Sequence, residues 1–263
     1  GPQHLYNMKV GLTDGADTLD VRNIRFGVRE LGYELSAYTE EGDSRLDFDP
    51  VVALQDGEIA FDNVRRRQAE GEMTIPYLAK AAGSPGVTPI NDPDMGEHIV
   101  VKVNGRRIFC KGGNWGMDDG MKRVTRERLE PYFKLHKNMH VTMIRNWTGE
   151  STEELFFDLC DEYGFLVFND FWLSTGGFNL NASDHRLFMA NVTEVVRRFR
   201  NHPSLALWCA RNEGFAVDEL EQHIAATIAR EDGTRHYLAN SRNINTTPSG
   251  PWTYEIDPKN YYI

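Results

Sequence analysis

The start of the chain alternates apolar and polar side chains, the pattern of strands with one buried face. The stretches HLYNMKVGL and TLDVRNIRFGVREL flank a DGAD turn, so they predict two or three antiparallel strands. A β-sandwich needs about seven strands to bury both of its inner faces. We therefore expect residues 1–32 to be the last strands of a β-sandwich whose earlier strands lie upstream.

Residues 33–97 lack a clear period. Their apolar residues are scattered among Asp and Glu, and the tract SPGVTPINDPDMG is rich in Gly and Pro, which favour turns and loops. We expect an irregular insertion or linker here. Acidic residues flank the basic run Arg65-Arg66-Arg67, which is typical of a solvated surface rather than a binding patch.

From residue 98 onward the pattern becomes regular. HIVVKV and RRIFCK flank Asn104-Gly105, a pair that tolerates positive φ at both centres of a type I′ turn, so they predict a β-hairpin. Beyond it, strand-like and helical segments alternate. Apolar residues spaced i, i+3, i+4 predict helices over 124–137, 152–163, 185–200 and 218–230.

The strands between these helices are short, continuous apolar runs, which indicate burial on both faces and hence a parallel sheet covered by helices. They are FCKGGNW, VTMIRNW, FLVFNDF, LALWCARNE and HYLANSR. This alternation permits a doubly wound sheet or a (β/α)8 barrel. KGGNWG contains neither GxGxxG nor GxxxxGK[ST], so phosphate binding has little support.

Polar and aromatic residues stand at the ends of four successive strands, where barrel enzymes place their chemistry. They are Asn114, Trp115, Arg145, Asn146, Trp147, Asn169, Asp170, Trp172, Arg211, Asn212 and Glu213. Trp faces stack on sugar rings, and Asp, Asn and Arg bind hydroxyls. The repetition therefore favours a barrel that binds a carbohydrate, with Glu213 as a candidate proton donor and Asn212 beside it for a sugar 2-hydroxyl.

Composition narrows the class of partner. The chain has a net charge of −10, which argues against the basic face that nucleic-acid binding needs. Since no run of about 18 apolar residues occurs, we expect no membrane span. The three cysteines Cys110, Cys160 and Cys209 have no CxxC spacing, so we expect buried free thiols, no metal and no cofactor.

At these residues the chain resembles glycoside hydrolase family 2, in the branch of β-mannosidases, endo-β-mannosidases and exo-β-glucosaminidases. The segments that carry the resemblance are VNGRRIFCKGGNW, MIRNW, FFDLCDEYGFLVFNDFW and RNHPSLALWCARNEG, with FGVRE as a weaker match to the last sandwich strand. It implies an α/β fold: the first part of a (β/α)8 barrel over residues 98–263, behind an immunoglobulin-like β-sandwich.

The resemblance also implies roles for single residues. Glu213 takes the acid/base position of the family's Asn-Glu pair, and the other implied residues bind the terminal sugar: Arg145, Trp147, Asp170, Trp172 and Asn212, with Asn114 and Trp115 at the edge of the subsite. The chain has WTGE where many members have WGGG, so the contacts around Trp147 are open. The expected substrate is a β-linked oligosaccharide.

Retaining hydrolysis needs a second carboxylate about 5–5.5 Å from the first. The resemblance implies that this carboxylate comes from barrel strand seven. Counted along the sequence, the last strand that we expect is the fifth, near Ser241, so the nucleophile is expected beyond Ile263. Five strands alone would leave an open edge and an exposed apolar interior. We therefore expect an inactive segment of a longer protein, truncated at both ends, whose remaining chain closes the barrel; family habit suggests a periplasmic or secreted enzyme.

Two alternatives stay open. Asp170 and Glu213 stand on neighbouring strands and could act as an inverting pair, which needs no downstream residue. The chain could instead be a non-catalytic barrel that only binds carbohydrate. The residues named here do not separate mannose from glucosamine or galactose, or exo from endo action.

Overall fold

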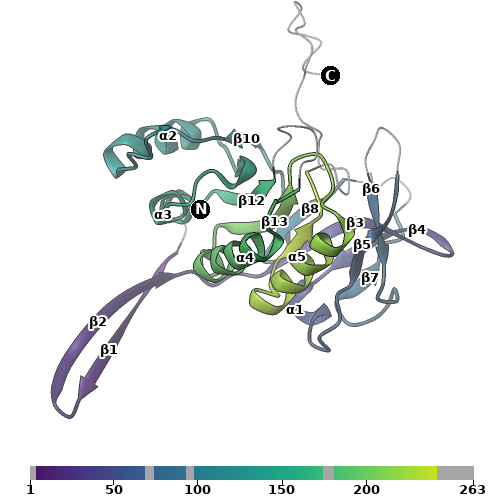
Figure 1. Cartoon of the computed structure of the whole chain (residues 1–263), viewed down its shortest axis with the longest axis horizontal. Helices are drawn as coiled ribbons and strands as arrows, with labels where there is room; N and C mark the ends of the chain where they lie inside the picture. Colours follow the sequence, from purple (N-terminus) through teal and green to yellow (C-terminus); the bar gives the residue numbers. More distant parts are fainter. Residues whose placement is uncertain (1–3, 69–73, 93–97, 174–180, 242–263) are drawn as a thin grey trace, which may run out of the picture.

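A computed structural model describes residues 4–68, 74–92, 98–173 and 181–241. Within these residues, a projecting hairpin, an antiparallel sheet and a parallel sheet with its helices can be distinguished (Figure 1). Residues 242–263, which we assigned to the barrel portion, lie outside the described part of the chain.

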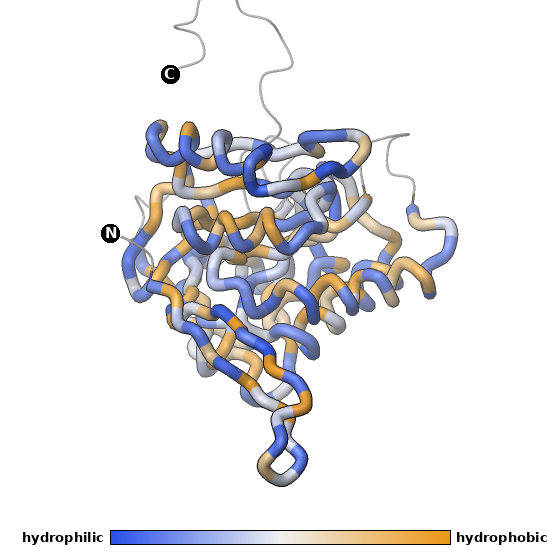
Figure 2. The backbone as a smooth tube through the Cα atoms, turned by 90° about the vertical axis from the view of Figure 1, so that its left-hand side faces the viewer, coloured by the Kyte–Doolittle hydropathy of each residue, from blue (hydrophilic) through white to orange (hydrophobic). Residues whose placement is uncertain are grey.

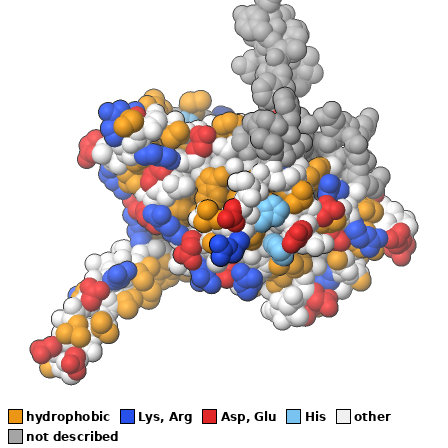
Figure 3. Space-filling view, viewed as in Figure 1, with side chains coloured by type: hydrophobic (Ala, Val, Ile, Leu, Met, Phe, Trp, Pro, Cys, Tyr) orange, Lys and Arg blue, Asp and Glu red, His pale blue; other side chains and the backbone are white. Residues whose placement is uncertain are grey.

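The hairpin consists of β1 (Tyr6–Asp14) and β2 (Asp17–Phe26), paired antiparallel as expected. It extends away from the rest of the molecule (Figure 1). Apolar side chains remain exposed along it (Figure 3), among them Met8, Val10 and Leu12. At its base, Arg25 forms ion pairs with Asp158 and Glu162 on the neighbouring helix α3 (Glu154–Tyr163).

The segment after the hairpin forms an antiparallel sheet rather than the irregular structure that we expected over residues 33–97. Its elements are β3 (Leu31–Thr39), β4 (Gly42–Phe48), α1 (Pro50–Ala53), β5 (Phe61–Gln68), β6 (Thr74–Leu78), β7 (Val87–Pro89), β8 (Val100–Val103) and β9 (Arg106–Ile108). The strand order is β5-β6-β3-β4-β7, and β8 pairs with β3 and β9. The β3–β6 pair is parallel and the other pairs are antiparallel, so we refer to it as the antiparallel sheet.

Both faces of β3 are buried, including the face that carries polar residues. Tyr33 and Leu35 alternate with Glu34 and Ser36, and all four are at most 5% exposed. The Glu34 carboxylate is paired with Arg107, 2.9 Å away, so an acidic residue that reads as surface is in fact covered. The predicted Asn-Gly turn between β8 and β9 is confirmed, with φ of 50° at Asn104 and 73° at Gly105.

The parallel sheet has five strands in chain order: β10 (Gly112–Trp115), β11 (Met143–Asn146), β12 (Leu166–Leu173), β13 (Leu205–Arg211) and β14 (His236–Leu238). The helices between them are α2 (Arg126–Asn138), α3, α4 (His185–Phe199) and α5 (Asp218–Glu231). The four expected helices are thus confirmed to within two residues at each end. Thr125 and Asp184 cap α2 and α4 with side-chain oxygens that accept backbone N–H groups.

The helices cover one face of this sheet, and one stripe of each is apolar (Figure 2). The opposite, inner face of the sheet is where the interior of a barrel would lie. We expected that face to be exposed, but within the described residues it packs against the antiparallel sheet. Met143, Phe168 and Leu207 are at most 9% exposed and share a core with Tyr33 and Leu35. The Tyr33 hydroxyl also donates to the carbonyl of Ala206, 2.6 Å away, which ties β3 to β13.

Cys160 and Cys209 are buried free thiols as expected, but Cys110 is exposed. Among the described residues, no helix is both long and apolar enough to cross a membrane.

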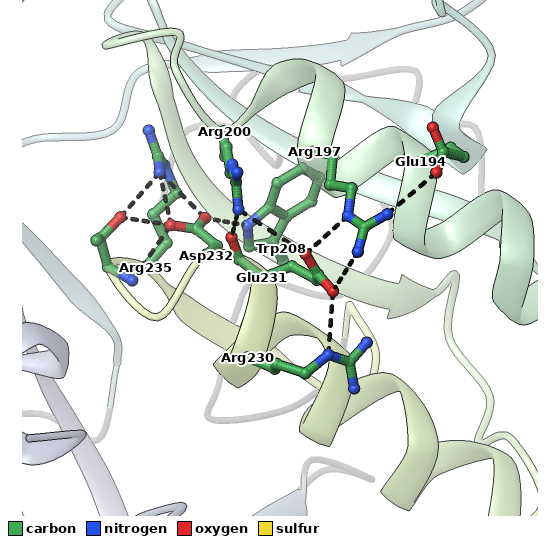
Figure 4. Close-up of polar contacts among 9 residues, drawn as sticks. Glu194, Arg197, Arg200, Trp208, Arg230, Glu231, Asp232 and Arg235 are labelled. Carbon is green, nitrogen blue, oxygen red and sulfur yellow. Dashed lines mark hydrogen bonds and ion pairs between the residues drawn. The ribbon is translucent and has the colours of Figure 1, made fainter. Parts of the chain in front are cut away.

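The ends of α4 and α5 are joined by an ion-pair network (Figure 4). Arg197 binds both carboxylate oxygens of Glu231, at 2.8 and 3.1 Å, and hydrogen bonds from Arg197 and Arg230 lower the pKa of Glu231 to about 2. Next to it, Asp232 accepts a hydrogen bond from Nε1 of Trp208 at 2.6 Å and pairs with Arg235 at 2.8 Å. The side chains of Asp232 and Arg235 are 1% and 5% exposed, so this second pair belongs to the core.

A buried carboxyl also lies where α5 meets the antiparallel sheet. Glu221 is 2% exposed, and Tyr237 donates to its Oε2 at 2.8 Å. Burial raises the pKa of Glu221 to about 7, while hydrogen bonds from Tyr237 and Asn63 act in the opposite direction. The folded protein therefore holds a proton here at a pH where the unfolded chain has lost it.

The contribution of Glu221 to stability is accordingly expected to fall as the pH rises from about 4.5 to about 7, since the folded state resists ionisation of this carboxyl over that interval. Glu221→Gln removes this effect, so it should stabilise the protein by up to about 3 kcal/mol at pH 8 and by little at pH 4. Urea unfolding of both proteins at the two pH values measures the difference. Glu219→Gln, on the exposed side of α5, is the control; an equal effect of Glu221→Gln at both pH values would contradict the prediction.

Candidate functional site

The candidate site lies where β11, β12 and β13 end. These strands are parallel and paired in order, so their carboxyl ends meet at one edge of the sheet. Side chains alternate between the two faces of a strand. Arg145 in β11 and Asp170 in β12 therefore share the inner face with Met143 and Phe168, whose side chains belong to the core on that side.

Arg145 and Asp170 form a buried ion pair. Nε and Nη2 of Arg145 donate to the two carboxylate oxygens of Asp170 at 3.1 and 2.6 Å, and the backbone N–H of Thr148 adds a third bond at 3.0 Å. The side chains are 12% and 0% exposed. Burial raises the pKa of Asp170, and the Arg145 guanidinium partly offsets the rise. All three hydrogen bonds come from N–H groups of Arg145 and Thr148, so these contacts stabilise the carboxylate form of Asp170.

Asn212 connects this pair to the end of β13. Its Oδ1 accepts hydrogen bonds from Nη2 of Arg145 at 2.9 Å and from Nε1 of Trp147 at 3.2 Å. Because both bonds end on the carbonyl oxygen, the side-chain amide N–H₂ of Asn212 is oriented away from them. One hydrogen-bonded network thus joins four of the predicted site residues: Arg145, Trp147, Asp170 and Asn212.

Glu213 follows Asn212 in a left-handed backbone conformation, with φ of 61°. Its N–H donates to Oγ of Ser241 at 3.0 Å, which links it to the residues after β14. Burial lowers the pKa of Arg145, but the charges of Asp170 and Glu213 raise it, and the net direction is upward. The charge of Glu213 is therefore close enough to act on Arg145.

The remaining predicted residues are placed differently. Asn114 is exposed and pairs in register with Arg145 on the adjacent strand, so it lies beside the network. The ring of Trp115 packs against helices α2 and α3. Its centroid lies 5.5 Å from the ring centroid of Phe133 and 5.6 Å from that of Phe156. The ring of Trp172 lies 6.1 Å from Phe188 of α4. The structure therefore does not bring Trp115 or Trp172 to Asn212.

Two asparagines at the strand ends have a structural role. Nδ2 of Asn146 donates to Oδ1 of Asn169 at 2.7 Å, and Oδ1 of Asn146 accepts the N–H of Ser151 at 3.0 Å. Both asparagines are nearly fully buried. They hold the turn that carries Trp147 against β12.

Sequence reasoning missed Thr148 and Ser241, which contact the network through a backbone N–H and a hydroxyl. Ser241 follows the fifth strand, so the rule that selected the other strand ends would have found it. Thr148 occupies the position at which the chain has WTGE instead of WGGG. It adopts φ of 49°, a conformation that Gly takes more readily. No signal in a single sequence points to its N–H.

Gly149, the next residue, is expected to tolerate no side chain. It has φ of 65°, and a Cβ placed there would lie 2.5 Å from the carbonyl oxygen of Asp170. Gly149→Ala should destabilise the fold by about 1–2 kcal/mol from the left-handed backbone alone, and the contact with Asp170 adds to this. Thermal unfolding measures the loss. Gly113→Ala, where a Cβ meets nothing within 4 Å, is the control, and an equally mild effect of both variants would refute the expectation.

One group of side chains in the described residues has the composition of a metal site. The ligand atoms of Asp158, Asp161 and His202 lie within 4.8 Å of one another. However, Asp158 pairs with Arg25, and Asp161 accepts the N–H of Ser204 and contacts His202 at 2.7 Å. These contacts stand near the start of β13, at the end opposite to Asn212, and tie the strand to α3.

Comparison with known proteins supports this reading of the strands. Mannosylglycoprotein endo-beta-mannosidase from Lilium longiflorum is 38% identical over 130 residues, which cover 46% of this chain and 14% of that protein. Beta-mannosidase B from Aspergillus clavatus is 30% identical over 203 residues, or 73% of this chain and 24% of that protein. The chain thus spans a quarter or less of the length of these relatives.

Solved structures give the same fold. The beta-D-mannosidase from Dictyoglomus thermophilum matches 92% of this chain and 25% of its own, with a TM-score of 0.62 and 25% identity. The exo-chitosanase from Amycolatopsis orientalis matches with a TM-score of 0.58 at 17% identity, covers 92% of this chain and 22% of its own, and shows the fold alone.

The model of the glycosyl hydrolases family 2 TIM barrel domain matches residues 97–247, which is more than half of the chain. This match begins just before β8 and continues past β14, so it contains every strand of the parallel sheet. The family and barrel inferred from the strand-end motifs are confirmed: the chain belongs to glycosyl hydrolases family 2 and carries part of its TIM barrel domain.

Proposed function

We propose that this chain is part of a retaining β-glycosidase that hydrolyses β-mannosides or related β-linked glycans. Glu213 acts first as the general acid on the leaving oxygen and then as the general base on water. The observation that carries this is the position of Glu213, next to an asparagine oriented by Arg145 and Trp147 at the carboxyl end of β13.

The substrate class rests on the relatives. Two that match this chain are named for β-mannoside hydrolysis, and a mannoside is therefore the first substrate to test. Asn212 is suited to contact a sugar hydroxyl, because two N–H donors on its carbonyl oxygen fix the orientation of its side chain. Arg145, Trp147, Asp170 and Asn114 would frame the subsite around it.

The remaining parts of the proposed enzyme follow from the double-displacement mechanism. A second carboxylate, expected beyond Ile263, attacks the anomeric carbon and is released by water. We also propose that β1 and β2 belong to an immunoglobulin-like sandwich, which would cover the exposed apolar side chains of the hairpin.

The inverting alternative is disfavoured by the contacts of Asp170. Both of its oxygens accept bonds from Arg145, one of them also binds the N–H of Thr148, and its side chain is 0% exposed. A general base that activates water needs an accessible oxygen. Asp170 is better suited to orient Arg145.

The anomer that forms first tests the proposal. We expect the full-length protein to release β-mannose from an aryl β-mannoside, followed by mutarotation, as observed by ¹H NMR in the first minutes. Initial release of the α-anomer would establish inversion. Glycan binding without turnover would establish the non-catalytic alternative.

A further inference from the structure

The loop that carries Glu213 connects β13 to α5 and has few backbone hydrogen bonds of its own. Glu213 occupies the left-handed region at φ of 61°, which a non-glycine residue keeps only where its surroundings hold it. Ser241 holds the N–H of Glu213 at 3.0 Å. On the other side of Glu213, the loop is held at Phe215.

Phe215 is fixed at two points. Its carbonyl oxygen accepts a hydrogen bond from Nη1 of Arg211, at 3.0 Å, and Arg211 is fully buried in β13. Its ring is covered by the guanidinium of Arg66, whose Cζ lies 3.7 Å from the ring centroid. A guanidinium within about 6 Å of an aromatic face is attracted by the ring quadrupole. The second contact therefore fixes the ring as the first fixes the backbone.

Arg66 comes from β5, in the segment that the sequence suggested to be an irregular insertion. Its own orientation is set by a hydrogen bond from Nη1 to the carbonyl of Asn63 at 3.2 Å. The same nitrogen lies 3.9 Å from Asp218, the first residue of α5. One side chain of the antiparallel sheet thus contacts both the loop after Glu213 and the helix that follows it.

We propose that Arg66 is a positioning residue for the Glu213 acid/base, and that the antiparallel sheet is thereby part of the active-site frame. This rests on the proposed function. Arg66 holds Phe215, two residues after Glu213, and so limits where the Glu213 carboxyl can lie relative to the leaving oxygen. Its loss should impair proton donation more than the binding of sugar.

Arg65 supplies a matched control. Its guanidinium lies 3.5 Å above the ring of Tyr77 and pairs with Glu40 at 2.6 Å. Arg65 is thus the same residue type, on the same strand, in the same kind of contact. Its partners, however, belong to the antiparallel sheet and to the turn after β3. Loss of Arg65 therefore reports the general effect of removing such a contact.

The test uses Arg66→Ala, Arg66→Lys and Arg65→Ala in the full-length protein, with kcat/KM measured on methyl and 2,4-dinitrophenyl β-mannoside. The methyl glycoside needs a proton on its leaving oxygen, whereas dinitrophenolate leaves without one. Arg66→Ala should lower kcat/KM for the methyl glycoside by about tenfold or more, because small displacements of a catalytic group are costly. The value for the dinitrophenyl glycoside should change by less than about threefold, since it does not depend on proton donation.

Arg66→Lys keeps a cation over the ring and should recover most of the loss, while Arg65→Ala should leave the ratio of the two kcat/KM values unchanged. Equal losses on both substrates, or the same ratio in Arg66→Ala and Arg65→Ala, would overturn the proposal. Should Arg66→Ala not fold, Phe215→Leu replaces it. We expect the same selective loss on the methyl glycoside, and an equal loss on both substrates would overturn the proposal. Glu213→Ala in the same assay distinguishes failure of this proposal from failure of the proposed function. If the loss of kcat/KM in Glu213→Ala does not depend on the leaving group, the proposed function itself fails.

Discussion

Glu213→Ala is expected to lower kcat/KM for an alkyl β-mannoside by about 10² to 10⁴, the usual contribution of a general acid. The same variant should hydrolyse 2,4-dinitrophenyl β-mannoside with kcat/KM close to the wild-type value, because dinitrophenol is acidic enough to leave as the anion. Initial rates on the two substrates in the full-length protein measure the contrast.

A second signature of the same variant comes from the later step. Without Glu213, water lacks its general base when it attacks the glycosyl-enzyme, so kcat for the activated substrate should fall. Azide needs no base, and its addition should restore turnover and yield the β-mannosyl azide. Glu219→Ala, at an exposed position of α5, serves as the control. Equal losses on both substrates, with no effect of azide, would refute the assignment of Glu213.

The largest loss of stability is expected from Asp232→Ala. The Asp232 carboxylate is 1% exposed and pairs with Arg235, while it also accepts the indole N–H of the fully buried Trp208 (Figure 4). Removal of the carboxylate leaves a buried guanidinium and a buried N–H without this partner. Breaking such a pair typically costs about 3–5 kcal/mol.

Urea unfolding at pH 7 measures this effect, with Glu194→Ala as the control. The Glu194 side chain is 75% exposed and lies 3.5 Å from Arg197 in the same network, so its loss should change the free energy of unfolding little. If Asp232→Ala behaved like Glu194→Ala, the pair with Arg235 would not contribute to the core as the structure indicates.

The barrel portion could be predicted from the sequence because its signals are local. Helices α2 to α5 each carry an apolar stripe on a polar background, and the parallel strands are continuous apolar runs between them. Parallel strands in chain order place their carboxyl ends together, so polar residues at successive strand ends had to meet. Arg145, Asp170 and Asn212 were selected in this way, and the structure places them in one hydrogen-bonded network beside Glu213.

The antiparallel sheet was missed from the sequence, and its central strand β3 is buried on both faces by tertiary contacts. Glu34 is covered by Arg107, which is distant in the sequence, and Ser36 accepts a hydrogen bond from Arg45 of the adjacent strand β4, so the polar face of β3 is buried rather than exposed. For the same reason Arg66 appeared to be a solvated charge. Only the packing of β5 against the loop after β13 places it on Phe215.

The tryptophans also show which features the sequence predicts and which depend on the tertiary structure. Their occurrence at strand ends is visible in the sequence, but the face on which each ring lies depends on the backbone at that end. Trp147 follows β11 in a turn held by Asn146 and Asn169, and its indole reaches Asn212. Trp115 and Trp172 pack toward the helices instead.

What the sequence determined by itself was therefore the order of strands and helices in the barrel portion, the family, and the edge of the sheet at which the candidate site lies, since all of these depend on local patterns. The tertiary structure decided which strand-end side chains share one network, what covers the inner face of the sheet, and what holds the Glu213 loop. Those contacts join residues that are far apart along the chain, and burial by a distant segment leaves no periodic mark on the sequence.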